Sequence, residues 1–144
     1  MRARKLFVEV TVALLVVLFL HTAISKFLDF KGFVYDLNNQ PFPNSFTPYL
    51  AWLIPLTELV IVCFLLFEKT RLAGLYASLV LMSAFTVYTC LVLLDVFAYV
   101  PCSCGGVVSY LTWAQHFFFN LFFVVIISIA IVLNRSKSFR FERT

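Results

Sequence analysis

The residues best suited to chemistry are two cysteines, Cys102 and Cys104, which lie one residue apart in the segment 101–106. A disulfide between them would close a very small ring, which departs from relaxed disulfide geometry and is easier to reduce. Two glycines follow and allow the backbone unusual dihedral angles. The last apolar run begins soon after, and the positive end of its helix dipole would stabilise a thiolate. This pattern predicts a thiol–disulfide exchange centre, with a pair of structural cysteines in a turn as the alternative.

Other cysteines and histidines could act with this centre. His116 lies early in the last apolar run and His21 late in the first, so either imidazole could approach the thiols. Cys63 and Cys90 fall within apolar runs, where free cysteine usually packs as a small hydrophobic residue. Two thiols and two histidines could instead bind copper(I) or zinc, and two histidines alone could ligate haem. No further signal supports these sites, so we predict neither a metal site nor a cofactor site.

Glu58 is the second candidate for chemistry, because it lies in the middle of an apolar run. A carboxylate within a membrane is costly, so it should face other helices and find a partner there. The candidate partners are Lys26, Gln115, His116 and Asn120. Glu58 could relay protons to the thiol chemistry, or it could be a hydrogen-bonded structural carboxyl group.

The composition indicates whether these residues belong to a protein in water or to a protein in a membrane. Of the 144 residues, 62% are hydrophobic and only 12% are charged, which is too little polar surface for a protein in water. The net charge of +4 arises from basic residues at the termini and in loops, without the exposed aromatic residues of a nucleic-acid surface. We therefore predict one integral membrane domain over residues 1–144 that binds no nucleic acid.

Four apolar runs are long enough to cross the ~30 Å hydrocarbon core as helices. They cover residues of about 6–27, 49–67, 72–97 and 110–133. Between the first two, residues 26–37 repeat apolar side chains at helical spacing among charged ones, which is typical of a helix on the membrane surface. The predicted fold is therefore all-α: a four-transmembrane-helix bundle with a short outer amphipathic helix.

Local signals refine these helices. Thr47 and Ser109 are predicted N-caps of the second and fourth spans. The small residues Gly74, Ala77 and Ser78 should permit close packing of the third.

The basic residues predict the orientation. Nine of the eleven lie at the N-terminus, in the turn at 68–71 or in the C-terminal tail, and only Lys26 and Lys31 lie on the opposite side. By the positive-inside rule both termini are cytoplasmic. The amphipathic helix and the Cys102–Cys104 loop then face outward, on the oxidising side of the membrane.

Several of these stretches also resemble a known family. They are residues 25–27, 55–59, 102–106 and 110–116 with Asn120. With them the chain resembles, over nearly its whole length, the MauE/DoxX family of small redox-associated membrane proteins. The resemblance implies four transmembrane helices in the bacterial inner membrane. Members related to methylamine utilisation are thought to support disulfide formation or maturation of a periplasmic dehydrogenase subunit.

Together these observations predict an inner-membrane thiol–disulfide redox protein, which could act as a thiol–disulfide oxidoreductase. Cys102 and Cys104 would exchange electrons with a periplasmic thioredoxin-like protein or a maturing secreted protein. His116 would tune the thiolate, and Glu58 would handle protons or hold the bundle together. The alternatives are a non-catalytic assembly subunit of a larger membrane complex and a Cys/His metal-handling membrane protein. We expect no cofactor, with quinone, copper and haem as alternatives; quinone-linked disulfide generators carry a second outer cysteine pair that this chain lacks.

Overall fold

The structure is a computed structural model that describes residues 2–96 and 112–141, with side chains up to residue 136. Within these ranges the chain forms helices and no strand. The elements are α1 (Arg2–Leu28), α2 (Phe30–Asn38), the 3-10 helix η1 (Asn44–Phe46), α3 (Thr47–Leu66), α4 (Arg71–Leu93) and α5 (Trp113–Phe141). Four of the helices are long and apolar enough to cross a membrane, which confirms the predicted all-α fold with four spans.

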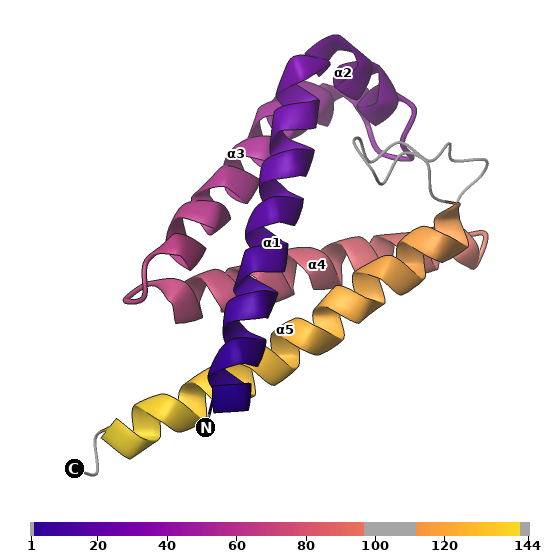
Figure 1. Cartoon of the computed structure of the whole chain (residues 1–144). Coiled ribbons are helices and arrows are strands. Elements are labelled where there is room, and N and C mark those ends of the chain that lie inside the picture. The colour runs from indigo at the N-terminus through magenta and orange to yellow at the C-terminus, as the bar shows by residue number, and fades with distance from the viewer. Residues whose placement is uncertain (1, 97–111, 142–144) are drawn as a thin grey trace.

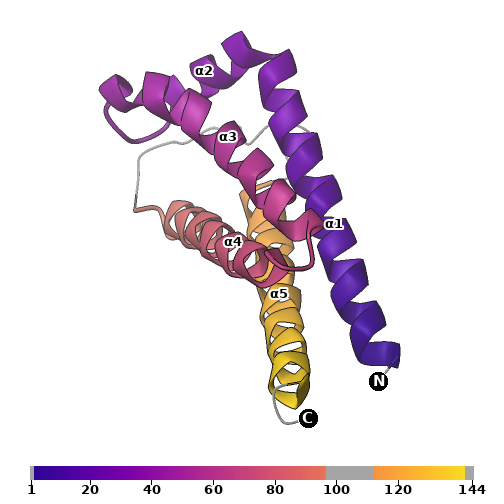
Figure 2. The ribbon, with the colours of Figure 1, turned by 90° about the vertical axis from the view of Figure 1, so that its left-hand side faces the viewer.

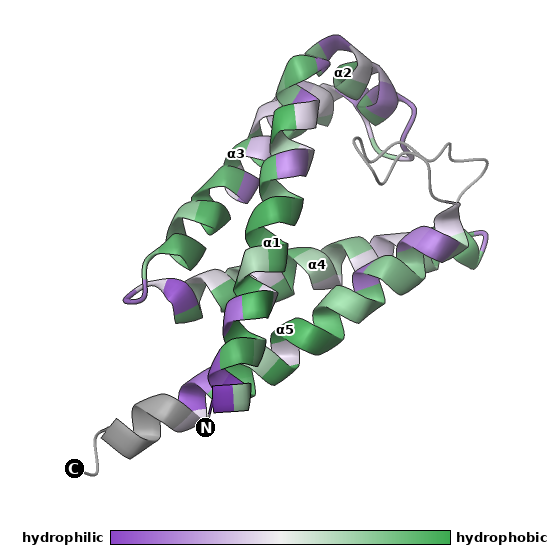
Figure 3. Ribbon diagram, viewed as in Figure 1, coloured by the Kyte–Doolittle hydropathy of each residue, from purple (hydrophilic) through white to green (hydrophobic). Residues whose placement is uncertain are grey.

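The long helices are arranged as two pairs. α1 packs along α3, and α4 packs along α5. The two pairs cross at a steep angle, and the short helix α2 lies where α1 ends and α3 begins (Figures 1 and 2). The start of α1 and the end of α5 lie toward the same end of the molecule. Hydrophobic residues run along all four long helices, whereas hydrophilic residues gather near helix ends and in α2 (Figure 3).

Two hydrophobic clusters hold this arrangement. The larger joins α1, α3, α4 and α5, with Leu15, Leu65 and Ile127 completely buried. The smaller packs Phe33 and Leu37 of α2 against Ala51 of α3. The smaller cluster fixes α2 across the ends of α1 and α3, which matters for the site described below.

The crossing of α3 and α4 requires a small residue. A Cβ atom added to Gly74 would lie 3.0 Å from the Leu65 backbone nitrogen, so a larger residue would push the helices apart. The prediction that Gly74 permits close packing is therefore confirmed.

The first helix boundary differs from its prediction. Lys26 belongs to the last turn of α1 and is buried, and is not part of the amphipathic helix. The chain breaks at Asp29, whose side chain accepts a hydrogen bond from the Gly32 backbone N–H and caps α2. Asp29 satisfies a backbone donor that the first turn of a helix leaves unpaired, and this is why the new helix starts there.

Other boundaries also move. α4 ends at Leu93, four residues earlier than predicted, and Asp95 then adopts a positive φ of 53°, which a helix cannot continue. α5 extends to Phe141, eight residues beyond its predicted end. Thr47 is the first residue of α3 rather than its cap, and its hydroxyl is buried. The predicted cap Ser109 lies outside the described residues.

Thr112 caps the described start of α5. Its hydroxyl accepts a hydrogen bond from the Gln115 backbone N–H, and the Gln115 side chain accepts one from the Thr112 N–H. This reciprocal pair is a capping box. It fixes where α5 begins, and therefore which of its residues face the other helices.

Candidate functional site

A buried ion pair connects α1 to α3. Lys26 Nζ lies 2.9 Å from Glu58 Oε1, and both side chains are almost completely buried. The ammonium group also lies 5.7 Å from the centre of the Phe33 ring of α2. Of the four candidate partners for Glu58, the structure therefore selects Lys26.

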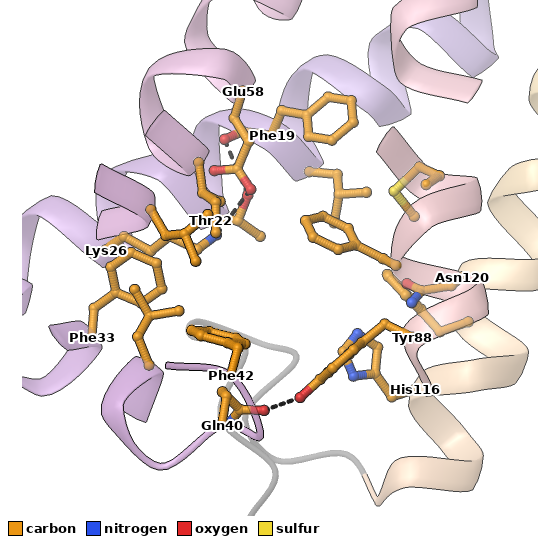
Figure 4. A pocket seen from close by; sticks show the side chains of 17 residues that line it. Phe19, Thr22, Lys26, Phe33, Gln40, Phe42, Glu58, Tyr88, His116 and Asn120 are labelled. Carbon is orange, nitrogen blue, oxygen red and sulfur yellow. Dashed lines mark hydrogen bonds and ion pairs between the residues drawn. The ribbon is translucent and has the colours of Figure 1, made fainter. Parts of the chain in front are cut away.

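The ion pair forms part of the wall of a cavity of about 250 Å³. Each of the α-helices α1 to α5 contributes to the wall, and most of it is apolar. Apart from the Gln40 amide, the charged, imidazole and amide groups lie on two opposite sides (Figure 4). Lys26 and Glu58 lie on one side, and His116 and Asn120 lie across from them.

The second polar side comes from one face of α5. His116 and Asn120 are four residues apart, so their side chains project from the same face of the helix. Both are buried. The His116 ring stacks on Trp113 with centroids 6.1 Å apart, and Trp113 in turn meets Tyr88 of α4 edge-on. These aromatic contacts hold the imidazole against the cavity.

The segment after α2 closes one end of the cavity. Tyr88 donates a hydrogen bond from its hydroxyl group to Gln40 Oε1. This bond ties α4 to the residues that follow α2, and both side chains line the cavity. This hydrogen bond therefore links α4 to the segment between α2 and α3.

Three polar atoms at the cavity have no hydrogen-bond partner among the described residues. They are Glu58 Oε2, His116 Nδ1 and Asn120 Nδ2. Buried polar atoms in proteins are nearly always hydrogen-bonded, because leaving one unpaired costs about 1–3 kcal/mol. Three such atoms around one cavity indicate a site for a molecule that carries polar groups of its own.

A comparison with models of protein families identifies the family of this chain. The family model described as methylamine utilisation protein MauE matches residues 4–133. The chain belongs to the MauE family. No match was found among curated proteins or among solved structures. Together with the four apolar helices, the match makes this MauE-family chain a multi-pass membrane protein in a lipid bilayer.

The sequence-predicted residues of this MauE-family protein fall into three groups. Glu58 and His116 both line the cavity, on opposite sides of it. Cys102 and Cys104 lie outside the described residues. Cys63 is exposed on the outer surface of the helices rather than packed inside, and Cys90 is partly buried; both are free thiols.

The histidine and metal predictions can be compared with the same residues. His21 is exposed on α1 and does not line the cavity, so the proposed pairing of His21 and His116 around a haem does not fit. Within residues 2–96 and 112–141 there is no group of three or more His, Cys, Asp or Glu side chains that could hold a metal ion.

Sequence reasoning missed part of the site. Lys26 and Asn120 entered only as candidate partners of Glu58, and Gln40 and Tyr88 were not singled out. Polar side chains inside or next to an apolar run are the signal that could have found them, because such residues are costly in lipid unless they face other helices.

Proposed function

We propose that this MauE-family protein is a thiol–disulfide redox protein of the bacterial inner membrane. It supports the maturation of an exported protein in a process of the methylamine-utilisation type, with Cys102 and Cys104 as the exchanging thiols. The supporting observation is the connectivity of the chain. Residues 97–111, which include both cysteines, join α4 to α5, and the joined ends of these helices carry Tyr88 and His116 at the polar cavity.

Two successive thiol–disulfide exchanges would transfer the disulfide to the exported partner. A thiolate of the exported partner attacks one sulfur of the Cys102–Cys104 disulfide, and a mixed disulfide forms. A second partner thiolate then attacks the mixed disulfide. The partner leaves with a new disulfide, and Cys102 and Cys104 remain as two thiols that hold the two electrons.

His116 and Glu58 have different roles in this proposal. His116 begins the buried face of α5 only four residues after the helix cap, so its imidazole is the titratable group of the cavity nearest in sequence to the cysteines. It would take and return the proton of an attacking thiol. Glu58 is neutralised by Lys26, which supports the role of holding α1 to α3 rather than that of a proton relay.

The proposed orientation has both termini in the cytoplasm and the Cys102–Cys104 loop in the periplasm. The nine basic residues counted above and the four candidate spans among the described residues support it. The periplasm is also the compartment in which structural disulfides form.

Thiol trapping in intact cells tests the proposal. Cells are treated with a maleimide that adds mass to free thiols, and the mass of the protein is read before and after depletion of exported substrates. We expect Cys102 and Cys104 to shift between the free and the protected form. The double variant C102S/C104S should lose oxidation of the partner, whereas the matched control C63S/C90S should retain it.

Unchanged oxidation of the partner in the variant would refute the proposal. If partner oxidation continues unchanged in C102S/C104S, the cysteines are not the exchanging thiols. Co-purification of a stoichiometric membrane partner with that same variant would then favour an assembly subunit, and copper or zinc lost in that variant would favour metal handling.

A further inference from the structure

We propose that the cavity between the helices binds the ring of a membrane quinone. The side chains that would contact the ring all lie among the described residues. It goes beyond the thiol chemistry proposed above, because binding of the ring does not require Cys102 or Cys104.

The size of the cavity fits one substituted ring. A cavity of ~150 Å³ accommodates a benzene molecule, and drug-sized molecules occupy sites of roughly 300–1,000 Å³. The present cavity, at about 250 Å³, lies between these limits. Its side walls include Phe19, Phe42, Phe85 and Phe119, whose rings suit a flat apolar ligand.

The charges around the cavity favour a neutral molecule. The opposite charges of Lys26 and Glu58 cancel within one ion pair. Among the described lining residues there is no Lys or Arg without a carboxylate partner. A fatty acid or a phosphate group would therefore add a negative charge beside the Glu58 carboxylate with no further cation to balance it, whereas a neutral quinone would not.

The polar atoms match the two oxygens of a para-quinone, which lie at opposite ends of the ring. On one side, Lys26 Nζ donates to Glu58 Oε1 and has further hydrogens to donate, since an ammonium group carries three. On the other side, the amide nitrogen of Asn120 is an unpartnered donor among the described residues. Each carbonyl oxygen of the quinone would therefore meet a donor.

The same walls also suit the reduced ring. A quinol presents two hydroxyl groups, which donate hydrogen bonds. Glu58 Oε2 on one side and His116 Nδ1 on the other are buried and have no partner within the described part of the chain. A carboxylate oxygen and an unprotonated imidazole nitrogen both accept hydrogen bonds. An acyl chain of a lipid would leave all of these atoms unpaired.

A quinone here would complete the proposed redox cycle. Oxidation of the Cys102 and Cys104 thiols to a disulfide releases two electrons and two protons. Reduction of a quinone to a quinol consumes two electrons and two protons. The two half-reactions therefore balance without any other oxidant or reductant.

Binding can be measured with the protein's own fluorescence, because quinones quench tryptophan emission. The chain has two tryptophans, and Trp113 stacks on His116 at the cavity. In the variant W52F, purified in detergent micelles, Trp113 is the remaining tryptophan. Short-chain analogues of ubiquinone and of menaquinone are titrated separately, so that a benzoquinone ring and a naphthoquinone ring are distinguished. We expect saturable quenching by at least one of them.

Two matched pairs of variants locate the ligand, all in the W52F background. N120L removes the amide donor and N134L makes the same change about 21 Å along the same helix, at 1.5 Å per residue. We expect N120L to weaken quinone binding about 3- to 10-fold, the loss of one hydrogen bond, and N134L to leave it unchanged. I54F fills the cavity without changing a polar group, and L53F places the same ring on the exposed neighbouring position. I54F should weaken binding more than L53F does, which keeps the test valid if N120L does not fold.

Two outcomes would overturn the inference. They are quenching by neither analogue, or equal effects of the two variants in each pair. The variant C102S/C104S should bind the quinone analogues as tightly as the wild type does, because the ring does not contact these cysteines in this proposal. Failure of this inference can therefore be told apart from failure of the proposed function. Quinone binding without partner oxidation by the wild-type protein would refute only the thiol chemistry, and partner oxidation without quinone binding would refute only the quinone site.

Discussion

Replacement of Lys26 by methionine should destabilise the protein strongly, because it leaves the Glu58 carboxylate buried without its partner. The two charged atoms are 2.9 Å apart, and the side chains expose only 6% and 2% of their surface. At an effective dielectric constant of about 20, unit charges at this distance attract by about 6 kcal/mol. The cost of burying both charges offsets part of this attraction, and removal of one partner from a buried pair costs about 3–5 kcal/mol. We expect K26M to lower the free energy of unfolding by about 3 kcal/mol.

The chain offers a matched control for this prediction. Arg71 and Glu9 form a second ion pair between α4 and α1 with nearly the same distance, 3.0 Å, but with 15% and 43% of their side-chain surface exposed. Water screens such a pair, and exposed pairs contribute about 0–1 kcal/mol. E9Q should therefore cost at most about 1 kcal/mol. Because the two ion pairs have nearly the same distance, the difference between the two losses of unfolding free energy reports the effect of burial.

Reversible unfolding in mixed detergent micelles, followed by circular dichroism, measures both effects. A cycle of K26M, E58Q and the double variant gives the coupling between the two side chains. We expect the double variant to lose clearly less unfolding free energy than the two single variants lose together, because it no longer holds an unpaired charge. Equal losses in K26M and E9Q, or strictly additive losses in the cycle, would refute the reasoning.

Three further predictions concern the helices around the site. Substitution of Gly74 by valine should lower the free energy of unfolding by about 1–3 kcal/mol in the same assay, because the new side chain meets the Leu65 backbone; an unchanged stability would contradict the packing. Substitution of Thr112 by alanine removes the cap of α5 and should cost about 0.5–2 kcal/mol, while serine at this position should retain most of it. Burial, and then the nearby charge of Asp29, raises the pKa of Asp36 above its ordinary value of 3.8. Because the folded state favours the protonated form, Asp36 stabilises the fold at acidic pH, and this contribution is lost as the pH rises through the raised pKa. Asparagine at position 36 should therefore remove part of the pH dependence of unfolding and raise stability at neutral pH, and a pH titration of D36N that matches the wild type would contradict this assignment.

The local pattern of the sequence was sufficient for the number and type of the helices. The four spans follow from long apolar runs, because a helix satisfies its own backbone hydrogen bonds in lipid and needs about 20 apolar residues to cross it. Helix ends were less certain. The break at Asp29 and the cap at Thr112 depend on which side chain reaches a backbone N–H, and neighbouring residues compete for that position.

The site was only partly accessible to sequence reasoning. Glu58 was predicted as a site residue because it is a carboxylate in an apolar run. His116 and Asn120 were candidates for the same reason, since they are polar residues in an apolar run. The sequence could not select Lys26 from the candidate partners, because 32 positions separate it from Glu58 and the choice depends on how α1 packs along α3.

The sequence by itself determined that this is a membrane protein of four helices with a few polar residues inside, since hydrophobicity and run length are properties of single segments. Only the tertiary structure decided that these polar residues surround one cavity. The steep crossing of the two helix pairs and the contact of Tyr88 with Gln40, 48 positions away, leave space between Lys26 and Glu58 on one side and His116 and Asn120 on the other. That space depends on the relative positions of all five helices, and no single segment of the chain encodes it.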